Sequence, residues 1–243
     1  MKITVKRYSQ ELALNENVTY DVALEGGTLL EVLSDIKTDQ DNTLSFASGC
    51  RSSICGSCAM RVNGTEVLAC AYKPQDGDVI EPLKNMRVIR DLVVDVDKAH
   101  SFMKIAHNWS STNTTNLIVS QENEKRNELQ SDCILCGACY SACPVYAVNG
   151  EFIGPFALTR SWRYINDVRE NNVEDKINVI QTNGIWDCTL CNECVPVCPQ
   201  GIAPKQDIAM LRSKSGTMGH MDPSFATTSF GSFDTGLPDF GSF

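Results

Sequence analysis

Apolar and polar side chains alternate in short runs along the first hundred residues, a period of two that is typical of strands with one buried face. These alternating apolar positions are Ile3 and Val5 in a first run and Val18, Tyr20, Val22 and Leu24 in a second. A Gly26-Gly27 pair follows, and apolar residues then recur at helical spacing over residues 28–37. The sequence therefore predicts a strand, a strand and a helix at the start of the chain.

Further strand signals lie between residues 59 and 97. Asn63-Gly64 separates two short apolar runs, and this dipeptide favours the type I′ turn of a two-residue hairpin. The runs at 79–83 and 87–94 are expected to supply the last strands. A small mixed domain would then end near Asp97.

The pattern becomes helical after a polar stretch at residues 108–132, which is rich in Ser, Thr, Asn and Gln and indicates a boundary region. Short helices are expected between the later cysteines, with a longer one over 156–169. Positions on one face of that helix recur every three or four residues, at Leu158, Trp162, Ile165 and Val168 or Arg169. After residue 212 the composition becomes rich in Gly, Ser and Phe, which predicts a flexible tail.

Composition and charge limit the classes of function. The 243 residues are 42% hydrophobic, which is enough for two ordinary domain cores, and they carry a formal net charge of -9. So acidic a chain is a poor partner for nucleic acid. No run approaches about eighteen consecutive apolar residues, and the first residues lack an apolar signal core, so no direct membrane span is expected.

All twelve cysteines fall into three tight groups. They are Cys50, Cys55, Cys58 and Cys70; Cys133, Cys136, Cys139 and Cys143; and Cys188, Cys191, Cys194 and Cys198. The first group has the CxxxxCxxC spacing, with a distant fourth cysteine, of plant-type [2Fe-2S] centres. The other two groups both read CxxCxxCxxxCP, the run of bacterial ferredoxins. The cysteines thus predict iron-sulfur chemistry and the order of three centres.

The fourth thiolate of a bacterial run binds the cluster of the other run. We therefore expect Cys143 and Cys198 to be exchanged between the two cubane sites. Pro144 and Pro199 follow these cysteines and turn the chain so that both runs can face one cluster.

Two other interpretations of the cysteines explain less. Disulfides suit short secreted domains, whereas this chain is long and its cysteines are so closely spaced that bridging within a run is geometrically poor. Structural zinc accounts for one pair of CxxC elements. It explains neither the consecutive repeats that end in Cys-Pro nor the CxxxxCxxC loop.

These patterns together predict an α+β protein with two domains. Residues 1–97 would form a β-grasp domain of the plant-type ferredoxin class, and 98–132 a connecting segment. Residues 133–212 would form an all-α domain like bacterial ferredoxins, with the tail at 213–243.

The first cysteine loop is rich in small residues, which let hydrogen-bond donors approach the sulfurs. The expected donors are the amides of Gly49, Ser52, Ser53 and Gly56 and the hydroxyl of Ser57. Such bonds favour the reduced, more negative cluster. They would raise its potential above the value of about −400 mV that is typical of plant-type centres.

Five segments around the cysteines carry a resemblance to a known family. They are SGCRSSICGSCAM at 48–60, RVIRDLVVD at 87–95, CILCGACYSACP at 133–144, GPFALTR at 154–160 with WRYIND after it, and CVPVCPQGI at 194–202. With these motifs, residues 1–212 resemble the iron-sulfur subunit of the succinate dehydrogenase and fumarate reductase family.

The resemblance implies an electron-transfer subunit with no catalytic residue of its own. It would pass single electrons between a FAD-containing dicarboxylate oxidoreductase subunit and a membrane-side, quinone-reactive subunit. These partners would hold it peripherally at the cytoplasmic membrane, on the cytoplasmic face, or on the periplasmic face if it is exported with a signal-bearing flavin subunit. Arg51 lies on the loop that faces the flavin subunit in this family, and is either a docking residue or a solvated cation.

A first departure from the usual family pattern concerns the third centre. Most relatives have an aliphatic residue at the position of Cys191, which leaves a [3Fe-4S] cluster. Here Cys143, Cys188, Cys191 and Cys194 are predicted to hold a second [4Fe-4S] cluster. The first would be held by Cys133, Cys136, Cys139 and Cys198. A [3Fe-4S] third cluster is the alternative if Cys191 points away.

A second departure concerns the quinone. The Trp pair and the His that line the quinone pocket of relatives are replaced by Ala147, Val148 and Thr189. We therefore expect the membrane-side partner to be a cysteine-rich subunit similar to one of heterodisulfide reductase. Electron transfer for another flavin-dependent hydroxy-acid dehydrogenase and a freely diffusing ferredoxin are the other functions considered. The sequence leaves open whether electrons flow from succinate or to fumarate.

Overall fold

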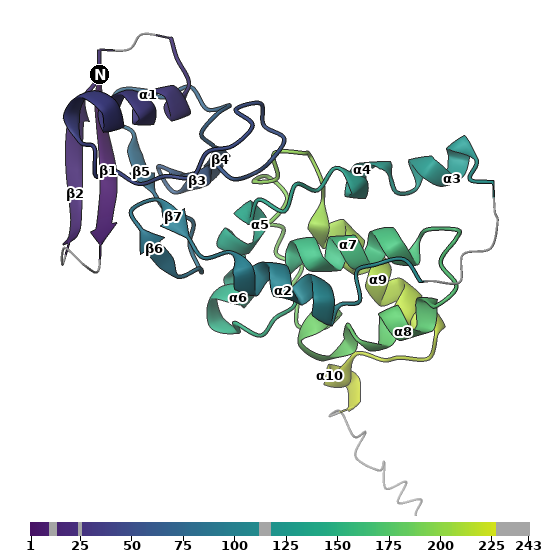
Figure 1. Cartoon of the computed structure of the whole chain (residues 1–243). Helices are drawn as coiled ribbons and strands as arrows, with labels where there is room; N and C mark the ends of the chain where they lie inside the picture. The colour runs from purple at the N-terminus through teal and green to yellow at the C-terminus, as the bar shows by residue number, and fades with distance from the viewer. Residues whose placement is uncertain (10–13, 24–25, 112–117, 227–243) are drawn as a thin grey trace, which may run out of the picture.

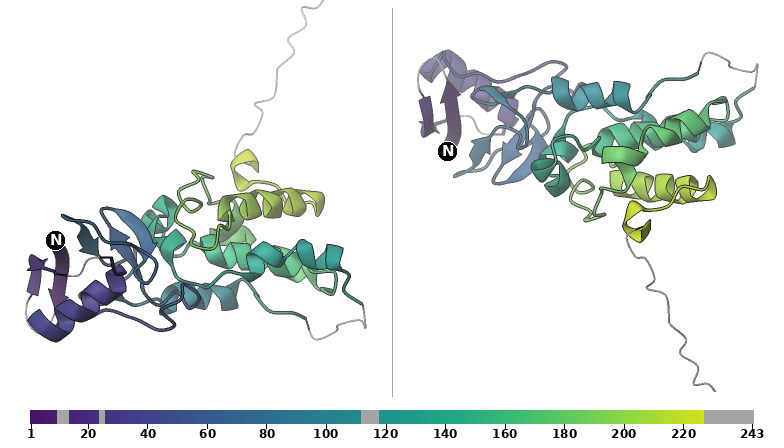
Figure 2. Two further views of the ribbon diagram at one scale, coloured as in Figure 1. Left: turned by 90° about the horizontal axis from the view of Figure 1, so that it is seen from above. Right: turned by 90° about the horizontal axis from the view of Figure 1, so that it is seen from below.

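The computed structural model describes residues 1–9, 14–23, 26–111 and 118–226 (Figure 1). Its strands and its first helix lie at one end of an elongated molecule and its other helices at the other end, an arrangement that both views of Figure 2 repeat. Leu24, assigned above to the second strand run, lies outside the described residues, as does the tail from residue 227 onward.

Five strands of the N-terminal half form one mixed sheet. They are β1 (Lys2–Ser9), β2 (Leu14–Asp21), β3 (Ala59–Val62), β4 (Thr65–Leu68) and β5 (Val79–Glu81), in the spatial order β2-β1-β5-β3-β4. β1 is antiparallel to β2 and parallel to β5, while β3 is antiparallel to β4 and β5. Ile3 and Val5 are fully buried, which confirms the period-two prediction for the first strand.

The predicted first helix is present as α1 (Leu29–Asp35), followed by the π-helical turn η1 (Ile36–Gln40). Thr28 accepts a hydrogen bond from the Glu31 amide, and the Glu31 carboxylate accepts one from the Thr28 amide at 2.7 Å. This capping box fixes the start of the helix. The buried face of α1 packs into the same core as the sheet.

The predicted hairpin turn is also present, with Asn63 at φ +50° and Gly64 at φ +87°, as a type I′ turn requires. The segment 87–94 differs from the expectation of one strand. It forms a separate two-stranded sheet of β6 (Val88–Arg90) and β7 (Val93–Val94), because the chain reverses at Asp91, where φ is +46°.

Every element that the structure describes after residue 96 is a helix. These are α2 (Asp97–Ile105), α3 (Gln121–Lys125), α4 (Glu128–Ser131), α5 (Ala138–Ser141), α6 (Pro144–Val148), α7 (Pro155–Ile165), α8 (Val173–Asn178), η2 (Gln181–Ile185), α9 (Pro204–Thr217) and α10 (Pro223–Ala226). α7 and α9 pack against each other and share one core with the cysteines between them.

Two helix ends differ from the expectations. α7 stops at Ile165 instead of residue 169, because Asp167 accepts hydrogen bonds from the amide and guanidinium of Arg169 and so stabilises a turn. α9 continues to Thr217, past the boundary expected at residue 212, since Leu211 and Ser215 are buried. Residues 213–217 are thus helical.

A buried ion pair joins the β6–β7 hairpin to the main sheet. The carboxylate of Asp91, which is fully buried, accepts hydrogen bonds from Arg7 Nε at 2.9 Å, the Tyr8 amide at 3.0 Å and the Ser45 amide at 2.8 Å. Asp41 supplies a second carboxylate to the Arg7 guanidinium. The network also holds the segment that leads into the first cysteine loop.

Replacing Asp91 with Asn should destabilise the protein, because it weakens three buried hydrogen bonds and leaves the buried Arg7 guanidinium with only the partly exposed Asp41 carboxylate as an ion-pair partner. We expect a loss of about 3 kcal/mol, which corresponds to a fall of about 6–12 °C in Tm for a chain of this size. Asp95→Asn is the matched control, since its partner Arg87 is exposed and solvent screens the pair, so this variant should change Tm far less than Asp91→Asn. Equal falls in Tm for the two variants would contradict this account.

Candidate metal centres

The first cysteine group lies at the end of the sheet that faces the helical half. Cys50 and Cys55 are exposed on the loop before β3, and Cys58 is buried at its end. The β3–β4 hairpin brings the fourth cysteine back, because the Ala69 amide donates to the Cys58 carbonyl at 3.0 Å. Cys70 itself lies two residues beyond the end of β4.

Backbone amides of this loop point at the sulfurs. Cys50 Sγ accepts hydrogen bonds from the amides of Ser52 at 3.3 Å, Ile54 at 3.4 Å and Cys55 at 3.3 Å. The Ser53 amide donates to Cys70 Sγ at 3.3 Å. Arg51 and Ser53 have φ values of +57° and +59°, which turn these amides inward. The Ser52 and Ser53 donors were expected from the sequence, whereas the Ile54 donor was not.

The surroundings divide the first four thiols into two kinds. A hydrogen bond from Ser57 Oγ at 3.1 Å, helped by the Cys50 amide, lowers the pKa of Cys55 to about 6. Burial raises the pKa of Cys58 to about 11. Burial opposes ionisation of Cys70 too, but hydrogen bonds from Ser53 outweigh it and lower the pKa. Cys55 and Cys70 are therefore the thiols of this group that ionise more readily than usual.

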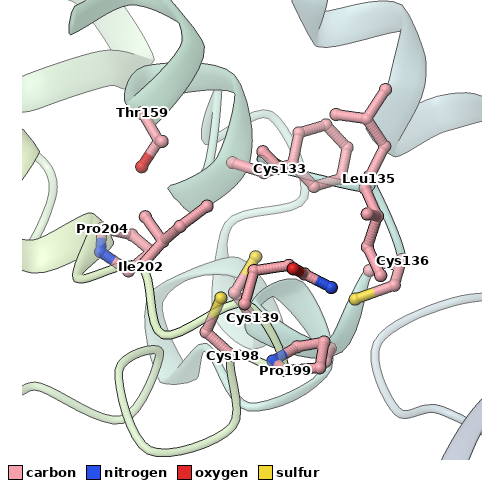
Figure 3. Close-up of a pocket in the computed structure, with 14 residues that line it drawn as sticks. Cys133, Leu135, Cys136, Cys139, Thr159, Cys198, Pro199, Ile202 and Pro204 are labelled. Atoms are coloured by element: carbon pink, nitrogen blue, oxygen red, sulfur yellow. The ribbon is translucent and has the colours of Figure 1, made fainter. Parts of the chain in front are cut away.

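A second pocket is lined by Cys133, Cys136, Cys139 and Cys198, three from one run and the fourth from the other (Figure 3). Its remaining lining is mainly apolar and includes Phe156, Pro199, Ile202 and Pro204. Burial raises the pKa of Cys136 to about 11 and that of Cys139 well above its usual value.

A third pocket is lined by Cys143, Cys188, Cys191 and Cys194, so here too the fourth cysteine comes from the other run. Burial raises the pKa of Cys194 to about 12, and also raises that of Cys143 and Cys188. Cys191 is exposed at the rim. Thr189 and Val148 stand where the sequence comparison expected the quinone-lining residues. Thr189 is exposed in the loop between Cys188 and Cys191, and Val148 at the end of α6 is 87% exposed.

The two cubane-type runs share an unusual backbone conformation. The residue before the second cysteine is left-handed in both, with Leu135 at φ +54° and Leu190 at φ +55°. The residue after it is left-handed as well, with Gly137 at φ +83° and Asn192 at φ +80°. Cys191 is therefore presented by the same local backbone as Cys136.

The chemistry of both pockets fits an iron-sulfur cluster. Among the described residues that line the two pockets, cysteine is the only common metal-ligating type, since neither lining includes Asp, Glu or His. Soft sulfur ligands in apolar surroundings favour iron-sulfur centres. No group of three or more Cys, His, Asp or Glu side chains in the described part of the chain is arranged to hold a single metal ion.

The first cysteine loop touches the second pocket directly. A Cβ atom on Gly56, where φ is +73°, would lie 2.7 Å from Cys136 Cβ, so only glycine permits this approach. Gln200, just after Pro199, donates from Nε2 to the Ser53 carbonyl at 3.1 Å. No hydrogen bond from the Gly49 or Gly56 amide to a sulfur is found among the described residues, although both were expected. The role that the structure supports for Gly56 is to let the first cysteine loop approach the second pocket.

Polar contacts across the same interface fix the relative position of the two halves. The Asn85 amide group donates to the carbonyls of Tyr140 and Ser141 at 3.0 Å each, at the end of α5. Ser141 Oγ donates to the Glu66 carboxylate at 2.7 Å and accepts from the Lys84 amide at 2.8 Å. These residues were not singled out from the sequence.

An arginine supports the third pocket. Arg212 on α9 donates from Nε to the Ile185 carbonyl at 2.7 Å and from one terminal nitrogen to the carbonyls of Trp186 and Cys188. Its charge opposes the effect of burial on the pKa of Cys188. Arg212 therefore holds the first cysteine of the third group in place.

A carboxyl group is buried between three helices beside the second pocket. Asp207 on α9 is 4% exposed, and accepts hydrogen bonds from Gln130 Nε2 of α4 at 2.9 Å and from Thr159 Oγ1 of α7 at 2.8 Å. Burial raises its pKa to about 6, although both hydrogen bonds lower it. In the described structure no cation pairs with it within 4.0 Å.

Comparison with known proteins matches both halves of the chain. Residues 2–101 match the 2Fe-2S iron-sulfur cluster binding domain, and residues 129–202 match the 4Fe-4S dicluster domain. The chain is 38% identical over 230 residues to the 8-methylmenaquinol:fumarate reductase iron-sulfur subunit of Wolinella succinogenes, covering 87% of this chain and 72% of that protein.

A second relative is the fumarate reductase iron-sulfur subunit of Escherichia coli O157:H7, with 35% identity over 227 residues, which cover 88% of this chain and 93% of the relative. A chain in the solved structure of the Mycobacterium smegmatis Sdh1 complex in the apo form has the same fold. The TM-score is 0.78 at 22% identity, with 90% of this chain and 96% of that chain covered.

Replacing Asp207 with Asn should stabilise the protein at pH 8. The pKa is higher in the folded state than in the unfolded state, so the favourable contribution is present below about pH 4 and is lost as pH rises through about 6. A shift from 3.8 to about 6 costs up to about 3 kcal/mol above pH 6. The Tm difference between variant and wild type, measured from pH 8 to pH 4, should therefore shrink. A variant that is less stable at every pH would refute this.

Proposed function

The chain belongs to the iron-sulfur subunits of the succinate dehydrogenase and fumarate reductase family, and we propose that it relays single electrons through three clusters held by its twelve cysteines. It is a non-catalytic electron carrier of an oxidoreductase complex. The observation that carries the proposal is the contact between the first cysteine loop and the second pocket at Gly56 and Cys136, which supports a direct electron-transfer step between these two proposed sites.

The proposed ligand sets follow the three groupings. Cys50, Cys55, Cys58 and Cys70 would hold a [2Fe-2S] cluster on a β-grasp domain, an architecture favoured by the mixed five-stranded sheet with α1 against it. Cys133, Cys136, Cys139 and Cys198 would hold a [4Fe-4S] cluster, and Cys143, Cys188, Cys191 and Cys194 a second one. When bound, the clusters supply one-electron redox chemistry. The chain's own donors and cations set how readily each site accepts negative charge.

Two partner subunits are proposed, one beside the first of the three sites and one beside the third. A FAD-containing dicarboxylate subunit would face the exposed loop of Cys50, Cys55 and Arg51. A quinone-reactive subunit on the membrane side would face the third site, where Cys191 and Val148 are exposed. The printed name of the Wolinella relative contains both 8-methylmenaquinol and fumarate. This name supports a quinone-reactive partner.

The membrane-side partner is proposed to be cysteine-rich, because Cys191 is present and the expected quinone residues are replaced. In the described part of the chain no helix has the length and apolar character needed to cross a membrane. Membrane association, proposed at the cytoplasmic face, would depend on the partner subunits.

Anaerobic purification of the complex through a tag on this chain tests the proposal. Mass spectrometry should identify a flavoprotein and a cysteine-rich subunit, and succinate should reduce the clusters or fumarate should oxidise them. The absence of a flavoprotein from the active complex would contradict the function. Two haem-bearing transmembrane subunits without a cysteine-rich subunit would contradict the proposed partner.

Replacing Cys191 with Ala should convert the third cluster to [3Fe-4S]. Low-temperature electron paramagnetic resonance of the oxidised variant should then show an intense [3Fe-4S] signal that the anaerobic wild type lacks. Thr189→Ala is the matched control, because Thr189 is exposed on the same loop and supplies no thiol. A wild type that already shows the signal would sink the [4Fe-4S] assignment.

Replacing Ser57 with Ala should lower the potential of the [2Fe-2S] cluster, because the Ser57 hydroxyl bonds to Cys55 Sγ and favours the reduced state. Ser52→Ala is the matched control, since its hydroxyl donates to the Cys50 carbonyl at 3.1 Å and not to a sulfur. A redox titration of both variants measures the difference. An unchanged or raised potential in Ser57→Ala would remove this residue from the account.

A further inference from the structure

Arg160 lies beside the first cysteine of the second pocket. It projects from α7, the helix that also supplies Phe156 and Thr159 to the lining of that pocket. One terminal nitrogen donates to the Cys133 carbonyl at 2.9 Å. The guanidinium is therefore close enough to act on the ligand.

One donor of this guanidinium has no acceptor among the described residues. Arg160 Nε is buried and makes no hydrogen bond in the described structure. The hydroxyls of its two chain neighbours bond elsewhere, that of Thr159 to Asp207 and that of Ser161 to Asn108 and the Ala157 carbonyl. A buried donor without a partner is unfavourable, so an acceptor is expected at this place.

Arg212 is the counterpart of Arg160 at the third pocket, and its Nε has a hydrogen-bond acceptor. Arg212 also donates to the carbonyl of the first cysteine of its group, Cys188, but its Nε donates to the Ile185 carbonyl. The two arginines thus hold equivalent cysteines through their terminal nitrogens, and only at the second pocket is Nε left for another acceptor.

We propose that Arg160 Nε donates a hydrogen bond to a sulfur of the cluster held by Cys133, Cys136, Cys139 and Cys198, and thereby raises the potential of that cluster. The inference rests on the proposed function, since it needs the cluster to be present. A charge-assisted hydrogen bond to sulfur favours the reduced state, which carries one more negative charge. Arg160 is a positioning and tuning residue, distinct from the ligands.

Redox titration of the intact complex tests this proposal with Arg160→Gln and Arg160→Lys. Arg160→Gln removes both the charge and the Nε donor, and should shift the one-electron equilibrium of one cubane at least tenfold toward the oxidised form, about 59 mV. Arg160→Lys keeps the charge but loses the Nε donor, so its potential should lie between those of Arg160→Gln and the wild type. The potentials of the other two clusters should stay unchanged.

Arg163→Gln is the matched control. It removes a cation from the same helix, but Arg163 Nε already donates to Ser131 Oγ at 2.9 Å and so has no free donor for a cluster sulfur. The variant should leave all three potentials unchanged. An unchanged cubane potential in Arg160→Gln, or a wild-type potential in Arg160→Lys, would overturn the proposal. If Arg160→Gln fails to assemble, the Arg160→Lys result alone decides.

The same titration separates this inference from the proposed function. A wild-type complex without cubane signals would contradict the function itself. Cubane signals with identical potentials in wild type and the Arg160 variants would contradict only the role of Arg160.

Discussion

Burial of cysteine thiols is the constraint on which the helical half of the molecule depends. Burial raises the pKa of Cys139 and Cys194, yet only thiolates bind iron, so these sites need a compensating positive charge. Each pocket also takes its fourth thiol from the other run, through Cys198 and Cys143. A cluster in either pocket would therefore cross-link segments far apart in the sequence, and α7 and α9 pack around both.

The positions of the sites follow from backbone features more than from side chains. Left-handed residues at Leu135 and Leu190 shape two equivalent loops, and the missing side chain of Gly56 lets the first loop reach Cys136. Hydrogen bonds from Asn85 to the end of α5 then hold the two halves together. Close, fixed spacing of this kind is what a relay of single electrons requires.

The sequence predicted the features that have a strong local signature. Cysteine spacing gave the groups, alternating apolar residues gave β1, and Asn63-Gly64 gave the hairpin. The end of α7, the bend at Asp91 and the contacts of Arg160 and Asp207 were not predicted. The end of α7 depends on a local contact between Asp167 and Arg169 that was not recognised in the sequence. The bend at Asp91 and the contacts of Arg160 and Asp207 depend on partners distant in the sequence, such as Thr159 and Gln130 for Asp207, and no local pattern distinguishes these charged residues from solvated ones.

Native mass spectrometry of the anaerobically purified chain tests the central claim most directly, because it weighs bound clusters without depending on their magnetic state. The account predicts one [2Fe-2S] and two [4Fe-4S] clusters on a chain whose cysteines are all reduced and unbridged. A chain that carries zinc, disulfides or a single cubane at full occupancy would contradict the assignment of two four-thiol pockets with exchanged Cys143 and Cys198.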